Sequence, residues 1–177
     1  MKTYRKTATL VGSAYLFSNI TFIVGTIVMV ESILGSPDYL NLMSASRAQV
    51  VLGVLLSFAN GLAYVGIAVL LFPILKPRFE SLALVYVGFR VVEFITQILA
   101  DVSPLALLTL AGDTGKVGAM QELGTLLLAE RFWAFQMLNL IFSLSALLLY
   151  VMLLRSRLIP GFISIWGLIA AVLVLLN

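Results

Sequence analysis

The sequence of 177 residues contains no cysteine and no histidine, and only 11% of its residues are charged. Without cysteine, the chain can form no disulfide, no thiolate nucleophile and no cysteine-ligated iron–sulfur cluster. Without histidine, it lacks the commonest metal ligand and the commonest general base, and histidine-ligated haem is excluded. We therefore expect no metal site and no cofactor, we assign no catalytic residue, and the sequence does not favour an enzyme.

The scarcity of charge also argues against a soluble domain, which usually carries about 25% charged residues. Hydrophobic residues make up 62% of the chain, in long unbroken runs rather than the short alternating segments of a barrel. Stretches of the roughly 20 apolar residues that a membrane helix needs lie near residues 7–30, 48–75, 81–100, 132–154 and 158–176. We predict an all-α fold, a polytopic transmembrane helix bundle of about five membrane-spanning helices, forming a single transmembrane domain over residues 1–177.

Basic residues predict the orientation of this bundle. They cluster before the first span at 2–6 and in the two short turns at 76–78 and 155–157. The opposite loops are longer and carry only Arg47, Lys116 and Arg131. This bias indicates a cytoplasmic N-terminus in a multi-pass protein of the cell membrane. Because topology explains the basic residues, the net charge of +3 does not indicate a nucleic-acid partner.

The segment from residue 101 to residue 130 admits two interpretations. The third helix continues past a kink at Pro104, or the segment forms an interfacial hairpin. Within this segment, the sequence predicts a turn over residues 112–118 and an amphipathic helix over residues 120–128.

Arg90 and Glu93 are the sharpest feature of the sequence. Arg90 lies about nine residues into the third predicted helix, or roughly 13 Å at 1.5 Å per residue, which is near the middle of the hydrocarbon layer. A charge there costs at least about 2.5–3.5 kcal/mol. The three-residue spacing lets the two side chains pair on one helix face. The pair is either a ligand or proton site, or a self-neutralising contact that fixes helix packing.

Polar residues extend this face and recur at similar depth on three other predicted helices. They are Gln97 and Asp101 on the third helix, Gln136, Asn139 and Ser143 on the fourth, Ser57, Asn60 and Tyr64 on the second, and Tyr15, Asn19 and Thr26 on the first. If these stripes face one another, they line a polar pocket that opens to the outside. The alternative is interhelical hydrogen bonding, worth about 0.6 kcal/mol per contact. The predicted ligand-binding residues are Arg90, Glu93, Gln97, Asn60, Tyr64, Gln136 and Asn139.

Two stretches resemble a known family. One is Gly-Phe-Arg-Val-Val-Glu at 88–93, and the other is Arg-Ser-Arg-Leu-Ile-Pro-Gly at 155–161, which leads to Trp-Gly-Leu-Ile at 166–169. Together they resemble the bacterial domain-of-unknown-function family numbered 4386, over most of the chain. The resemblance implies a six-helix membrane protein with no established activity and no functional residues to carry over. A sixth helix would be expected beyond Asn177, where this chain stops.

Three functions fit these observations. The leading hypothesis is an integral membrane protein that binds a small or amphipathic molecule in the outward-facing polar pocket, to move or sense it. The second is a structural or assembly subunit, because small residues four apart let helices approach closely; these pairs are Ala8 with Gly12, Ser57 with Gly61, and Gly167 with Ala171. The third is an intramembrane lipid-modifying enzyme with Glu93 as acid or base. The expected partners are the lipid bilayer and a small-molecule or lipid ligand, with a homo-oligomer as an open alternative.

Overall fold

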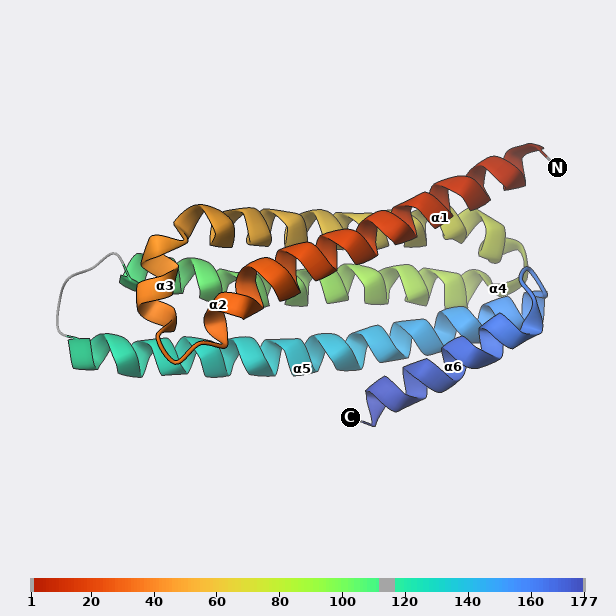
Figure 1. Ribbon diagram of the computed structural model, residues 1–177. Helices are drawn as coiled ribbons and strands as arrows, with labels where there is room; N and C mark the ends of the chain where they lie inside the picture. The colour runs from red at the N-terminus through yellow and green to blue at the C-terminus, as the bar shows by residue number, and fades with distance from the viewer. Residues whose placement is uncertain (1, 112–116, 177) are drawn as a thin grey trace.

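The computed structural model describes residues 2–111 and 117–176, and it confirms the all-α prediction, with helices and no strand in these ranges (Figure 1). The elements in chain order are α1 (Lys2–Phe22), the π-helix η1 (Ile23–Glu31), α2 (Ser32–Leu34), α3 (Tyr39–Ala45), α4 (Arg47–Ala111), α5 (Val117–Ser156) and α6 (Gly161–Leu175). Among the described residues, three helical stretches are long and apolar enough to cross a membrane, namely Lys6–Leu34, Arg47–Ala111 and Gln121–Ser156.

The 65-residue helix α4 folds back on itself at Phe79, whose dihedral angles are non-helical (φ −143°, ψ 49°). Pro77 precedes the break, and it has no backbone N–H with which to continue the helical hydrogen bonds. The first arm (47–78) and the second arm (80–111) lie side by side (Figure 1), and each exceeds the roughly 20 residues that one crossing needs. The number of membrane crossings stays a prediction.

The part of residues 101–130 that the structure describes is helical, which favours a continued third helix over an interfacial hairpin. The second arm runs through Pro104 to Ala111 with helical dihedral angles, so the third predicted helix continues there without a break. α5 already begins at Val117 and includes residues 120–128. Residues 112–116, where most of the predicted turn falls, lie outside the described residues.

The last helix is shorter than the predicted span over 158–176. α6 begins at Gly161, because Pro160 is extended (φ −54°, ψ 133°) and Arg157 takes a left-handed conformation (φ 53°) in the turn before it. Its 15 residues fall short of the roughly 20 that cross a bilayer. α6 packs back along α5 from this turn (Figure 1).

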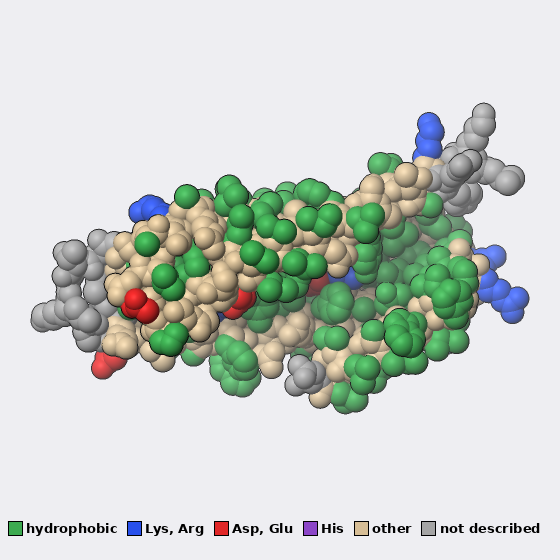
Figure 2. Space-filling view, viewed as in Figure 1, with side chains coloured by type: hydrophobic (Ala, Val, Ile, Leu, Met, Phe, Trp, Pro, Cys, Tyr) green, Lys and Arg blue, Asp and Glu red, His purple; other side chains and the backbone are tan. Residues whose placement is uncertain are grey.

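One end of the bundle gathers both short turns and the N-terminus (Figure 1). Arg78 Nη1 donates a hydrogen bond to the Ser156 carbonyl oxygen at 3.0 Å, which joins the two turns. Figure 2 shows Lys and Arg side chains at this end. The arrangement agrees with the bias of basic residues that predicts a cytoplasmic N-terminus, and the side of the membrane stays a prediction.

Two apolar clusters of buried residues close the two ends of the bundle. The turn-end cluster consists of Ala68, Leu75, Ala83, Tyr86, Leu149 and Met152. The α3-end cluster consists of Val30, Ile33, Leu34, Met43, Val50, Leu107 and Leu108. Along both arms of α4, the polar residues of the sequence stripes lie between these clusters.

Candidate functional site

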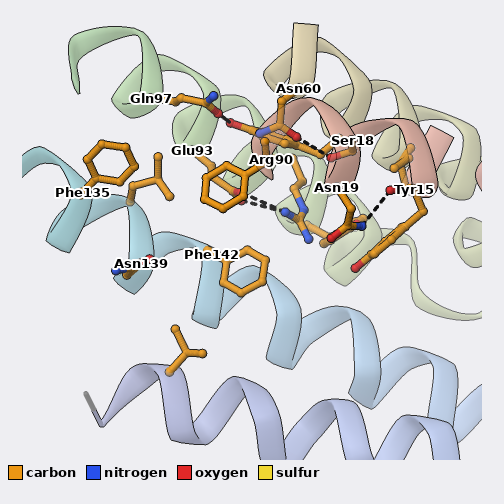
Figure 3. A pocket seen from close by; sticks show the side chains of 16 residues that line it. Tyr15, Ser18, Asn19, Asn60, Arg90, Glu93, Gln97, Phe135, Asn139 and Phe142 are labelled. Carbon is orange, nitrogen blue, oxygen red and sulfur yellow. Dashed lines mark hydrogen bonds and ion pairs between the residues drawn. The ribbon is translucent and has the colours of Figure 1, made fainter. Parts of the chain in front are cut away.

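A cavity of about 330 Å³ lies between the two apolar clusters, and Figure 3 shows the side chains that line it. It is lined by α1, both arms of α4, α5 and Val174 of α6. The predicted residues that line it are Asn60, Tyr64, Arg90, Glu93, Gln97 and Asn139. Gln136 is half-buried on α5 but is not among the lining residues. Helical spacing therefore brings six of the predicted side chains to one cavity, and ligand binding by them stays a prediction.

Arg90 and Glu93 form an ion pair on the wall of this cavity. Nη1 of Arg90 donates to both carboxylate oxygens of Glu93 at 3.0 Å each, and the two side chains are only 5% and 4% exposed. Ser145 Oγ, on α5, lies 3.4 Å from Glu93 Oε2. Nε of Arg90 is buried and has no hydrogen-bond partner among the described residues. The pair is thus neutral overall and leaves part of the guanidinium unsatisfied.

Three aromatic rings surround the Arg90 guanidinium. Its Cζ lies 5.6 Å from the centroid of Tyr64 and 5.5 Å from the centroids of Tyr86 and Phe142. Rings at this distance attract a cation through their negative faces. The rings come from both arms of α4 and from α5, so they fix the guanidinium in place and give the cavity apolar walls beside its polar groups.

Side-chain amides and hydroxyls supply the remaining polar surface of the cavity. Ser18 Oγ donates to Asn60 Oδ1 at 2.5 Å, and Asn19 Nδ2 donates to the Tyr15 carbonyl oxygen at 2.8 Å (Figure 3). Asn139 accepts a bond from Ser143 through its backbone carbonyl, and its side-chain amide bonds to no other described residue. An amide carries donors and acceptors together, so this surface suits an uncharged polar group.

The exposed lining residues lie on the side of the bundle. Tyr15 and Phe22 of α1 are 42% and 37% exposed, and Val174 of α6 is 38% exposed, whereas Arg90 and Glu93 are buried. Figure 2 shows acidic and basic atoms in a hollow among hydrophobic side chains on the face that carries α1. The sequence predicts an opening toward the outer surface. The exposed lining residues indicate an opening on the side of the bundle, and an opening toward the outer surface stays a prediction.

A second polar layer adjoins the cavity toward the α3 end. Tyr64 donates its hydroxyl to Gln97 Oε1 at 2.7 Å, and Gln97 Nε2 donates to Ser57 Oγ at 2.6 Å. Ser57 Oγ in turn donates to Asp101 Oδ2 at 2.6 Å. Arg131 Nη1 lies 3.5 Å from Asp101 Oδ1. Ser57 and Asp101 of the sequence stripes therefore belong to this layer rather than to the cavity.

Arg131 is the residue that sequence reasoning misplaced. The sequence predicts a loop charge at Arg131, but the residue lies inside α5 with a side chain only 4% exposed. Its Nη2 donates to Glu31 Oε1 at 2.8 Å, and its Nη1 donates to the Ala100 carbonyl oxygen at 2.7 Å. Glu31 lies 100 residues away in the sequence, so no local spacing signals the pairing.

Other lining residues were missed because they carry no polar signal or only a weak one. They are Ser18, Phe22, Ile67, Tyr86, Phe135, Leu138, Phe142 and Val174. Ser18 is three residues from Tyr15, which the polar stripe included, and this spacing is a signal that places it on the same face. The sequence of an apolar span does not indicate whether an aromatic or aliphatic side chain faces the cavity or the lipid.

No group of three or more carboxylate, histidine or cysteine side chains that could hold a metal occurs among the described residues. Comparison with protein families matches residues 10–177 to the family described as "Domain of unknown function (DUF4386)". No match was found among curated proteins or among solved structures. The matched range includes the cavity and the second polar layer. The family description names no activity, so the evidence for a function comes from the site itself.

Proposed function

Because the chain belongs to the DUF4386 family, whose description names no activity, we propose a function from the cavity: the protein binds a small or amphipathic molecule there, to move or sense it. The proposal places the protein in the cell membrane as a multi-pass protein. The observation that carries it is a buried ion pair on the wall of a cavity of about 330 Å³ at mid-length in apolar helices.

The size of the cavity supports a ligand rather than packing alone. Protein interiors are close-packed, with few voids larger than a water molecule. Small-molecule sites hold about 300–1,000 Å³ and combine apolar walls with a few polar groups. The cavity of about 330 Å³ lies at the lower end of this range. A contact that served only to pack the helices would bring Arg90 and Glu93 together without leaving such a space beside them.

The structural-subunit alternative is weakened by where its small residues lie. A Cβ added to Gly61 would meet the Phe94 ring at 2.1 Å, and one added to Gly167 would meet the Tyr150 ring at 2.3 Å. These two glycines therefore pack against other helical segments of the same chain and are not available to a partner helix. A Cβ at Gly12 meets no atom within 4 Å, so this position alone of the three remains for a partner helix. The enzyme alternative gains no support, because Glu93 is held by Arg90 and a lone carboxylate is weak evidence for catalysis.

The test is to identify what the purified protein carries. The full chain is purified in a zwitterionic detergent, and bound small molecules are extracted and measured by mass spectrometry. Asn139→Phe fills the cavity, and Gln136→Phe is the matched control, since both are half-buried amides of α5 and only Asn139 lines the cavity. We expect a molecule in near-stoichiometric amount with the wild type and the control, and its loss with Asn139→Phe. Equal amounts in all three proteins would contradict the proposal.

A further inference from the structure

We propose that the ligand is a lipid with an uncharged head that bears hydroxyl or amide groups, and that it enters the cavity sideways from the bilayer. This inference rests on the proposed function and names the ligand class and its route. The geometry carries it in two steps, from the charge balance of the cavity wall and from the position of its opening.

The charge balance of the cavity selects an uncharged head. Arg90 binds both oxygens of Glu93 at 3.0 Å, so the charged groups of the lining cancel. A carboxylate or phosphate head would add an uncompensated charge in an environment of low dielectric, or it would displace Glu93 and leave that carboxylate buried alone. A cationic head would meet the guanidinium, which already lies among the rings of Tyr64, Tyr86 and Phe142.

The amides of the cavity fit such a head directly. The Asn139 amide has no partner among the described residues, and it offers both a donor and an acceptor. Asn60 and Asn19 add further amide groups to the lining. Hydroxyl and amide heads also donate and accept, so they satisfy these groups without bringing a charge.

The route follows from the two closed ends. The apolar clusters fill both ends of the bundle. The exposed lining residues are Tyr15, Asn19 and Phe22 of α1 and Val174 of α6. The surface around Phe22 is apolar, because the α1 residues Ile20 and Ile23 are also exposed. A hydrocarbon tail leaving the cavity between α1 and α6 therefore stays in contact with lipid while the head remains inside.

The first experiment compares heads on one tail. A monoacylglycerol, a fatty acid and an alkyl trimethylammonium of the same chain length compete for the protein in phosphatidylcholine nanodiscs. We expect the monoacylglycerol to bind at least about tenfold more tightly than either charged probe, and to lose this advantage with Asn139→Phe but not with Gln136→Phe. Tighter binding of a charged probe, or equal binding of all three, overturns the inference.

The second experiment tests the route and uses the absence of cysteine from the chain. Phe22→Cys and Phe17→Cys place a thiol on two exposed positions of α1, and only Phe22 lines the cavity. After reaction with a bulky maleimide, we expect monoacylglycerol association to slow at least about tenfold at Phe22→Cys and to stay unchanged at Phe17→Cys. An unchanged rate at both positions overturns lateral entry.

Failure of this inference is distinguishable from failure of the proposed function. If the wild type carries a molecule that Asn139→Phe loses, but the probes show no preference for the uncharged head, the cavity binds a ligand of another class. If Asn139→Phe changes neither the carried molecule nor the binding of any probe, the proposed function fails as well.

Discussion

At the scale of single residues, Arg131 joins parts of the fold that lie far apart in the sequence. It lies on α5 and contacts Glu31 at the end of η1 and Asp101 on the second arm of α4. The contacts with Glu31 and Asp101 span 100 and 30 residues of sequence. A buried charge is costly unless it is paired and hydrogen-bonded, so this layer is sensitive to the loss of any member.

We predict that Arg131→Met lowers the free energy of unfolding by about 3–5 kcal/mol, because it leaves Asp101 buried without a cation. Arg155→Met is the control, since Arg155 is exposed near the end of α5, and its cost should stay within about 0.5 kcal/mol. Reversible unfolding in mixed micelles measures both. A similar change in the free energy of unfolding for the two variants would show that the contacts of Arg131 contribute little to stability.

The pair Arg90–Glu93 should show strong coupling in a double-mutant cycle. Arg90→Met and Glu93→Gln each leave one buried group unpaired, so each single change is expected to cost more than about 1.5 kcal/mol. The double change removes both charges and should recover most of that loss. Thermal unfolding in detergent gives the comparison. Additive effects would mean that the two side chains do not depend on each other in the folded protein.

The sequence predicts residue positions well where spacing along one helix decides them. Glu93 and Gln97 follow Arg90 at intervals of three and four, so they share its face whatever the helix packs against. Gln136 and Asn139 are also three apart, yet only Asn139 lines the cavity, because the rotation of α5 about its axis is set by packing. Arg131 could not be placed for a related reason, since its partners are on other elements.

At the scale of elements, η1 and the first arm of α4 approach each other closely at two glycines. A Cβ added to Gly53 would lie 2.8 Å from the Gly25 carbonyl oxygen, and one added to Gly25 would lie 2.8 Å from the Gly53 carbonyl oxygen. Backbone atoms cannot move aside as a flexible side chain can. The two glycines therefore hold η1 close to α4, next to the layer in which Glu31 meets Arg131.

We predict that Gly53→Ala destabilises the protein by about 1–3 kcal/mol through this steric conflict. Gly66→Ala is the matched control on the same arm, because a Cβ there meets no atom within 4 Å. It should be neutral or stabilise by up to about 1 kcal/mol, since alanine favours a helix more than glycine does. Thermal unfolding of both variants decides the matter, and equal effects would argue against a close crossing.

Element boundaries were predictable only where a local signal controls them. The break at Phe79 follows Pro77 and the charged residues of the turn, and the sequence predicts a turn there. Pro104 carried the same signal, but the second arm continues through it. Pro104 and its neighbour Ser103 are buried, and Ser103 Oγ donates to the Glu130 carboxylate of α5. Contacts between helices hold this stretch helical, and such contacts cannot be read from the segment itself.

At the scale of the whole molecule, the placement of the turns predicts which sites are reachable from each side of the membrane. With no natural cysteine, Arg155→Cys and Pro37→Cys give one thiol at the turn end and one near α3. A membrane-impermeant maleimide should label Pro37→Cys in intact cells and Arg155→Cys only after the membrane is disrupted. The reverse pattern would place the N-terminus outside.

The all-α class was predictable, because long apolar runs without the alternation of a barrel can satisfy their backbone hydrogen bonds in a bilayer only as helices. The cavity was predictable as a meeting of polar stripes, since four helices carry them at similar depth. Its lateral opening was not, because it depends on how far α1 and α6 lie apart and on which apolar clusters close the ends. These are properties of the assembled bundle rather than of any helix.

The most direct test of the central claim measures the molecule bound to the double variant Arg90→Met/Glu93→Gln after its thermal stability has been shown to recover. If the cavity is a ligand site in which the ion pair takes part, the variant is folded but carries much less of the bound molecule than the wild type, because both charged groups of the cavity lining are gone. If the stable double variant carries the same amount as the wild type, the ion pair serves packing alone and the cavity is not the site proposed.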